Sequence, residues 1–222
     1  DLDGTLYDDR AYVEAGFRSA ATHLNEAYGI ETFGDMIWEY AVERNFKTVF
    51  NRVLASYDLP ETEIGNLVSA YHDSNPELSP YPEAEKMLTN LPSNCPTAVI
   101  TGGKHGSTKL RQLGLADAFD DVYVTPDNGT SKREATPFEA VLDSLGVNPQ
   151  RAVFVGDNPE LDFYWPNNLG MTTIWVRRPH TLFKSPDSPE VRPDYVLPDL
   201  SLVPDIVSTI LDDATSSSST SE

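Results

Sequence analysis

Four short segments of this sequence carry side chains whose types and spacing could do chemistry together. In chain order they hold two close carboxylates, a hydroxyl beside two glycines, a cation, and a second acidic pair: Asp1 with Asp3, Thr101-Gly102-Gly103, Lys132, and Asp157 with Asp162. Phosphoryl transfer needs a metal ion, a nucleophile, a proton donor and groups that neutralise charge. The set offers a group or a ligand for each task, so it favours phosphate chemistry if the fold gathers it in one place.

The elements that must gather these residues are short strands alternating with helices. Apolar, β-branched runs predict strands at residues 97–101, 121–125, 152–156, 172–176 and 195–197, and helical periodicity fills residues 107–115, 137–145, 159–169 and 202–211. Such alternation predicts an α/β fold, a Rossmann-like doubly wound parallel sheet covered by helices on both faces. Open sheets of this kind place their sites at the carboxyl ends of the strands, where the three later segments are expected.

Residues 9–78 show helical periodicity without any strand pattern, which predicts a small helical bundle. Its expected helices span residues 11–29, 38–57 and 64–71, and its expected core includes Phe17, Trp38 and Phe46. The sequence therefore predicts a Rossmann-like core of residues 1–8 and 79–212, an inserted helical domain of residues 9–78, and a disordered Ser/Thr-rich tail of residues 213–222.

The four segments resemble, in order and spacing, the four motifs of the haloacid dehalogenase superfamily. Asp1-Leu2-Asp3-Gly4-Thr5-Leu6 is similar to the first motif, Val99 to Gly103 to the second, Lys132 to the third, and Gly156 to Asp162 to the fourth. The helical insertion after the first motif resembles the cap of one subclass of the superfamily. Because the first motif normally follows directly on a buried strand, we expect several more apolar residues before Asp1 in the natural protein.

This resemblance implies a magnesium-dependent phosphohydrolase that works through an aspartyl-phosphate intermediate. Asp1 would be the nucleophile, and Asp3 would serve as general acid and then as general base. The Mg²⁺ ion would bind Asp1, the backbone carbonyl of Asp3, and Asp157.

The remaining motif residues would handle the phosphate group and the order of the site. Thr101 and the Gly102 amide would hold phosphate oxygens, and Lys132 would neutralise charge on Asp1 and on the phosphoryl group. Asp162 would orient the metal site without binding the ion itself.

Lys132 departs from the family pattern in the residues that follow it. The family continues with Pro, then Asp or His, then Pro, whereas Arg133-Glu134-Ala135 follow here. Thr136 and Glu139 form a capping-box pattern, and Pro137 suits a first helical turn, so Lys132 is expected in the loop before a helix. Arg133 remains an alternative for the cation of the third motif.

Other functions of the same residues are weaker. A calcium-binding loop counted from Asp1 needs Gly at position six and Glu at position twelve, where Leu6 and Tyr12 stand. A dehalogenase has no leaving alcohol to protonate and would not need Asp3. A phosphomutase on the same scaffold stays open as an alternative. A non-catalytic binding protein of this fold is a further alternative, although none of the motif carboxylates or the cation is missing.

Charge and composition narrow the class of partner. The net charge is −19, from 35 acidic and 16 basic residues, and such a surface repels nucleic acid phosphates and anionic membranes. A small phosphate ester, with no nucleic acid and no membrane partner, is the expected ligand, and a cytoplasmic location is expected; the sequence does not predict an oligomeric state. The acidic bias reflects either adaptation to high salt or an ordinary solvated surface.

Overall fold

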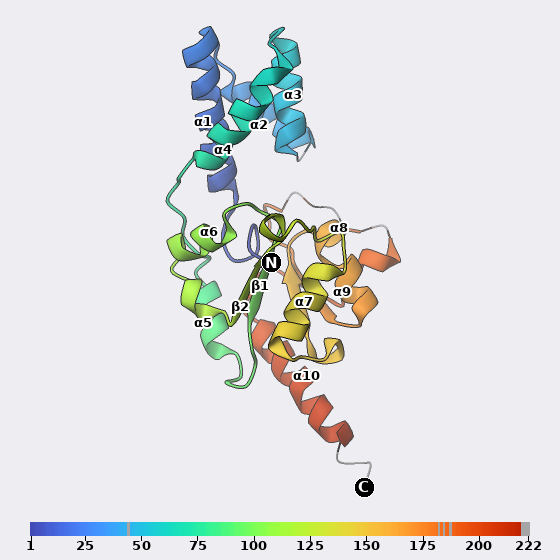
Figure 1. The fold of residues 1–222 in the computed structure, drawn as a ribbon. Helices are drawn as coiled ribbons and strands as arrows, with labels where there is room; N and C mark the ends of the chain where they lie inside the picture. The colour runs from blue at the N-terminus through green and yellow to red at the C-terminus, as the bar shows by residue number, and fades with distance from the viewer. Residues whose placement is uncertain (44, 182, 184, 187, 219–222) are drawn as a thin grey trace. The chain divides into compact units, whose positions relative to one another are not determined.

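The structure, a computed structural model, describes residues 1–43, 45–181, 183, 185–186 and 188–218 (Figure 1). The chain divides into two compact units. A core unit contains Asp1–Asp8 and Ser79–Glu222, and a cap unit contains Asp9–Leu78. The core unit is discontinuous in sequence because the cap unit is inserted after Asp8.

The described part of the core unit contains five short strands, all of them paired in parallel. β1 (Ala98–Thr101) pairs with β2 (Asp121–Val124), while β3 (Val153–Gly156), β4 (Thr172–Val176) and β5 (Tyr195–Leu197) form a second sheet in that order. The register places Thr101 opposite Val124, and Gly156 opposite Trp175. All five agree with the strands expected from β-branched runs, and the predicted α/β fold is confirmed.

Helices lie on both sides of these strands. α6 (Gly106–Gln112) and α7 (Thr136–Leu145) both contact β2, and Figure 1 shows them on opposite sides of it; α5 (Ala84–Asn90) packs against α10 (Val203–Ser218). Short 3-10 helices complete the unit at Ala116–Ala118, Thr125–Asn128, Pro149–Arg151 and Pro189–Val191. An apolar cavity of about 600 Å³ is lined by residues of both β1 and β3, with Asp1 in its wall.

An apolar cluster joins α7 to the strands of both sheets. It consists of Ile100, Phe138, Val141, Phe154, Phe163 and Trp175. Burial of one such side chain stabilises the fold by about 1.5–3 kcal/mol relative to leaving it exposed. The cluster therefore ties β1, β3 and β4 together, and Thr101 and Asp157 stand at the carboxyl ends of β1 and β3.

The helix expected over residues 159–169 is divided in two. α8 (Pro159–Asp162) ends at Asp162, and the fully buried Phe163 separates it from α9 (Tyr164–Leu169). Pro166 has no backbone N–H, so it cannot donate the bond that would continue one helix through this point. The short α8 places Asp162 near the end of β3.

Four α-helices and one 3-10 helix form the described cap unit. They are α1 (Arg10–Tyr28), α2 (Phe33–Glu43), α3 (Phe46–Ser56), the 3-10 helix Glu61–Glu63, and α4 (Ile64–Asp73). The Phe17 ring lies at the centre, edge-on to the rings of Phe50 and Tyr71 at 5.9 and 5.3 Å. A β-carbon at Gly16 would lie 2.5 Å from the Tyr71 ring, so glycine permits the close packing of α1 and α4.

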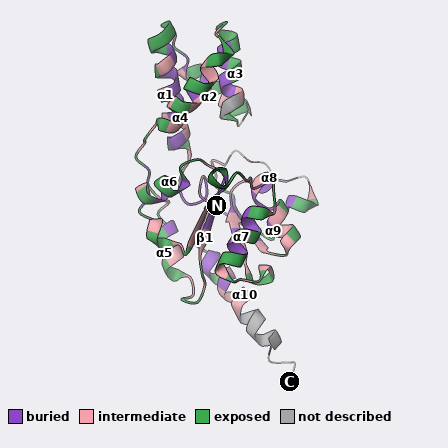
Figure 2. Cartoon of the chain, in the orientation of Figure 1, coloured by how far each residue is buried: buried purple, intermediate pink, exposed green. Residues whose placement is uncertain are grey.

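Two expectations for the cap unit were wrong. The single helix expected over residues 38–57 is two helices, and Asn45, a residue type favoured at helix starts, precedes the second. Trp38 is 72% exposed rather than part of the core, because α2 begins at Phe33 and buries the face that contains Met36. Phe17 is buried as expected, and the side chain of Phe46 lies outside the described residues. Figure 2 shows buried and exposed positions alternating along the cap helices.

The C-terminal helix is longer than the sequence predicted. α10 runs from Val203 to Ser218 and enters the segment expected to be disordered. No Gly or Pro interrupts the chain between Pro204, in the first turn, and Ser218, so no residue stops the helix earlier. Residues 219–222 of the expected tail lie outside the described residues.

Candidate active site

The first motif forms a tight turn beside β3. The backbone nitrogen of Asp1 donates to the Val155 carbonyl at 2.9 Å, and the Leu6 nitrogen donates to the Leu2 carbonyl at 3.0 Å. The buried Thr5 hydroxyl donates to Asp1 Oδ2 at 2.8 Å. These bonds fix both the backbone and the carboxylate of Asp1.

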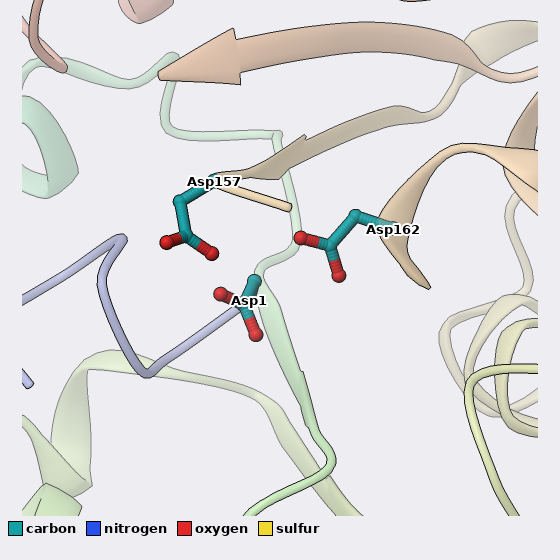
Figure 3. A group of neighbouring side chains, drawn as sticks. All are labelled: Asp1, Asp157 and Asp162. Atoms are coloured by element: carbon teal, nitrogen blue, oxygen red, sulfur yellow. The ribbon is translucent and has the colours of Figure 1, made fainter. Parts of the chain in front are cut away.

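Three carboxylates meet at the carboxyl end of β3. Asp1, Asp157 and Asp162 each offer an oxygen, and these oxygens lie within 4.8 Å of one another. Figure 3 shows the three carboxylates facing a common space, Asp157 from the end of β3 and Asp162 from α8. The Trp175 indole donates to the Asp157 carbonyl at 2.8 Å and holds this segment in place.

This donor set fits a divalent metal ion. Carboxylate oxygens are the ligands that hard cations prefer. Both oxygens of Asp162 already accept hydrogen bonds, Oδ1 from Lys132 at 2.8 Å and Oδ2 from the Asn158 amide at 3.0 Å. Through these two bonds Asp162 orients Lys132 and the Asn158 backbone beside the cluster.

Lys132 joins two of the three carboxylates. Its buried ammonium contacts Asp1 Oδ1 and Asp162 Oδ1. Arg133 is exposed, so the structure brings Lys132 and not Arg133 to the site. The capping box expected at Thr136 does not form, because Ala135 is the N-cap residue and makes no side-chain capping bond. The loop position of Lys132 before α7 nevertheless agrees with the expectation.

Asp3 lies in a network of its own. Thr101, the last residue of β1, donates to Asp3 Oδ2 at 3.2 Å, while the Tyr7 hydroxyl and the Lys109 ammonium both contact Oδ1. Burial raises the pKa of the Asp3 carboxyl, but the charge of Lys109 and the hydrogen bonds from Lys109, Tyr7 and Thr101 outweigh it. The pKa therefore lies below its ordinary value of 3.8. Gly102, which follows Thr101, is exposed.

Glycines let the motifs approach one another. A β-carbon at Gly4, where φ is +77°, would lie 2.3 Å from Asp157 Oδ2, and one at Gly156 would lie 2.4 Å from Asp162 Oδ2. Real β-carbons do not come so close to another atom. These two motif glycines therefore give the carboxylates the space in which they meet.

Sequence reasoning missed two basic residues that support the site. Lys109 occupies a core-facing position of α6, in a row with the buried Gly106 and Leu110, and a lysine in such a row was the available signal. Arg178 is buried, forms an ion pair with Glu83 at 2.7 Å, and donates to the Thr5 carbonyl at 3.4 Å. No motif marked Arg178.

This chain is similar in sequence and in fold to known phosphatases and to a dehalogenase. The glyceraldehyde 3-phosphate phosphatase of Methanopyrus kandleri is 29% identical to this chain over 212 residues, which are 88% of this chain and 89% of that protein. The crystal structure of a HAD phosphatase from Thermococcus onnurineus is similar with a TM-score of 0.67 and 26% identity, covering 93% and 95% of the two chains. A 2-haloacid dehalogenase from Pseudomonas syringae pv. Tomato DC3000 has the same TM-score at 25% identity, covering 94% and 96%.

None of the helices in the described residues is both long and apolar enough to span a bilayer.

Family models agree with these neighbours. A model of haloacid dehalogenase-like hydrolases matches residues 1–163, and a second, HAD-hydrolase-like model matches residues 130–203. The first match includes the two carboxylates of the first motif, Lys132 and Asp162, and it covers well over half of the sequence; the chain belongs to the haloacid dehalogenase-like hydrolase family.

Proposed function

We propose that this protein is a magnesium-dependent phosphatase that hydrolyses a small phosphorylated metabolite through an aspartyl-phosphate on Asp1. The observation that carries the proposal is the position of Asp3, a second carboxylate that contacts Thr101 beside the Asp1–Lys132 pair. A dehalogenase has no leaving alcohol to protonate, whereas cleavage of a phosphate ester does. Asp3 therefore favours a phosphatase over the dehalogenases that share the fold.

The reaction would proceed in two steps with opposite proton transfers. In the first, an Asp1 oxygen bonds to phosphorus, the ester P–O bond breaks, and Asp3 gives a proton to the leaving oxygen. In the second, Asp3 takes a proton from water, which attacks phosphorus and releases Asp1. The lowered pKa of Asp3 keeps its carboxyl group deprotonated, which is the form that the second step requires. For the first step, the negative charge of an arriving phosphate would raise that pKa and favour the protonated acid.

The other site residues would hold the ion and the phosphate. Asp1, Asp157 and the Asp3 backbone carbonyl would bind Mg²⁺, which supplies stabilisation of the charge on the phosphoryl oxygens when bound. The cluster of carboxylate oxygens at Asp1, Asp157 and Asp162, which lie within 4.8 Å of one another, supports this assignment. Phosphatases of this family generally use a divalent metal ion, and Mg²⁺ is our specific proposal.

The substrate oxygens would meet groups from the second and third motifs. Thr101 and the Gly102 amide would bind phosphate oxygens, and Lys132 would offset the charge shared by Asp1 and the phosphoryl group. Asp162 would hold Lys132 in place, which its 2.8 Å contact with the ammonium supports.

Glyceraldehyde 3-phosphate is the first substrate to test. Relatives that carry the name glyceraldehyde 3-phosphate phosphatase match most of this chain, at 28–29% identity for four of them. Identity at this level supports a short phosphorylated metabolite more strongly than one compound. The cytoplasmic location and the absence of nucleic acid and membrane partners stay predictions.

Phosphate release tests the proposal directly. The protein is assayed with Mg²⁺ against glyceraldehyde 3-phosphate, phosphoserine, sugar phosphates and nucleoside monophosphates, with Asp1→Asn as the control. We expect release from at least one small ester, and no release by Asp1→Asn. Release that survives in Asp1→Asn, or no release from any compound with any divalent cation, would refute the proposed function.

A further inference from the structure

Lys109 is a buried cation that lies outside all four motifs. It belongs to α6, the helix that follows the second motif, and its side chain is 5% exposed. Its Nζ atom lies 2.5 Å from Asp3 Oδ1. A charged ammonium is costly to bury unless an opposite charge compensates it, so this ion pair ties the position of Lys109 to that of Asp3.

The contacts of Lys109 belong to a network that holds both oxygens of Asp3. Tyr7 donates to the same Oδ1 atom that Lys109 contacts, and Thr101 donates to Oδ2 at 3.2 Å. The Lys109 ammonium also lies 6.0 Å from the centre of the Tyr7 ring. If Asp3 turned away, the buried Lys109 ammonium would lose this ion pair. Lys109 therefore favours one orientation of the Asp3 side chain.

Gly103 lies directly against Asp3 and Lys109 in this network. A β-carbon at Gly103 would lie 2.5 Å from Asp3 Oδ2 and 3.1 Å from Lys109 Nζ. The two cations thus serve different carboxylates, since Lys132 contacts Asp1 and Asp162 while Lys109 contacts Asp3. One cation stands at the proposed nucleophile and the other at the proposed proton carrier.

We propose that Lys109 is a positioning residue for proton transfer. It holds the Asp3 carboxylate in the orientation in which Asp3 gives a proton to the leaving oxygen and later takes one from water. Lys109 itself neither gains nor loses a proton in either step. Proton transfer requires the two heavy atoms to lie within about 2.6–3.2 Å, so a fixed carboxylate orientation directly affects the rate. This inference rests on the proposed phosphatase activity.

The first test compares Lys109→Met with Arg111→Met, which removes an exposed cation from the same helix. Both are assayed with Mg²⁺ on p-nitrophenyl phosphate, whose leaving group needs little protonation, and on glycerol phosphate, whose leaving group does. Misplaced groups cost roughly 10²-fold in rate. We expect a loss of that order in kcat for Lys109→Met on glycerol phosphate, a smaller loss in burst rate on the aryl ester, and little change in KM. Arg111→Met should match the parent.

A double-mutant cycle separates action through Asp3 from independent binding. If Lys109 acts through Asp3, Asp3→Asn combined with Lys109→Met loses no more activity than Asp3→Asn alone. Losses in activity that multiply in the double variant would overturn the inference. So would a raised KM or parental rates in Lys109→Met, or a loss of burst rate on p-nitrophenyl phosphate equal to the loss of kcat on glycerol phosphate. If Lys109→Met does not fold, Lys109→Gln, which keeps a hydrogen-bond donor of similar length, is put through the same cycle.

A structural readout keeps this inference separate from the proposed function. If the parent releases no phosphate, the proposed function fails, and the crystal structure of Lys109→Met still tests the network. We expect the Asp3 carboxylate to leave its contact with Thr101 or to occupy more than one orientation. An Asp3 side chain that keeps its single orientation in Lys109→Met would overturn the inference.

Discussion

Lys132 Nζ lies 2.8 Å from Asp162 Oδ1, and the same ammonium contacts Asp1. Lys132→Met should therefore lower kcat by about 10²–10³-fold, the usual cost of removing one group that stabilises charge in the transition state. Arg133→Met removes the exposed neighbouring cation and should stay close to the parental rate. The measurement is steady-state phosphate release by both variants. A larger loss in Arg133→Met would reverse the assignment of the third motif.

Substitutions at the two carboxylates of the first motif should affect different steps of the reaction. Asp1→Asn removes the nucleophile, so turnover of every substrate should vanish. Asp3→Asn loses only the proton carrier, which is worth about 10²–10⁴ in rate, and it should still form phosphoryl-enzyme with an aryl phosphate. Pre-steady-state release of the aryl alcohol should show a rapid burst followed by slow turnover. An Asp3→Asn variant that hydrolysed an alkyl phosphate at the parental rate would contradict its role.

The close approach of Gly103 to Asp3 gives a steric test. In Gly103→Ala the new β-carbon would lie 2.5 Å from Asp3 Oδ2, so the carboxylate must shift, and kcat should fall roughly 10²-fold. In Gly102→Ala the β-carbon meets nothing within 4 Å and the amide is kept, so the loss should be much smaller. Comparable losses in the two variants would show that the contact at Gly103 does not decide the position of Asp3.

Glu63 should make the cap unit sensitive to acid. Hydrogen bonds from Asn66, His23 and Tyr28 lower the pKa of Glu63 from 4.5 to about 2. A lowered pKa contributes stability above the unfolded value of 4.5, and this contribution disappears as the pH falls toward 2. The difference in melting temperature between the parent and Glu63→Gln should shrink as the pH falls below 4.5. Glu61→Gln, an exposed carboxylate on the same 3-10 helix, is the control, and an equal trend in it would refute the assignment.

The net charge of −19 predicts a dependence on salt if the surface is an adaptation to high salt. Self-repulsion destabilises a compact state, and salt screens it. The melting temperature should then rise steadily from dilute to molar potassium chloride. A flat or falling curve would identify an ordinary acidic surface.

The sequence predicted the residues that extend from strand ends and missed those whose role depends on distant partners. Asp157 and Lys132 could be placed because each follows a strand in a parallel sheet, where carboxyl ends meet. Lys109 could not, because its partner Asp3 stands 106 positions away and no spacing rule links a helix face to a turn. The prediction that Trp38 is buried was wrong for a related reason. Periodicity shows that a helix has two faces, but it does not decide which face packs against a neighbour.

The isolated bridge between Tyr7 and Pro80 closes the chain segment that contains the whole cap unit. The entropy lost on closing such a loop grows only with the logarithm of its length, about 0.6 kcal/mol for each doubling. The core unit would therefore tolerate a longer or shorter insert between these two residues at small cost to its own stability. The insert can then change in length or sequence, while Asp1, Asp3 and their partners in the core unit keep the same contacts.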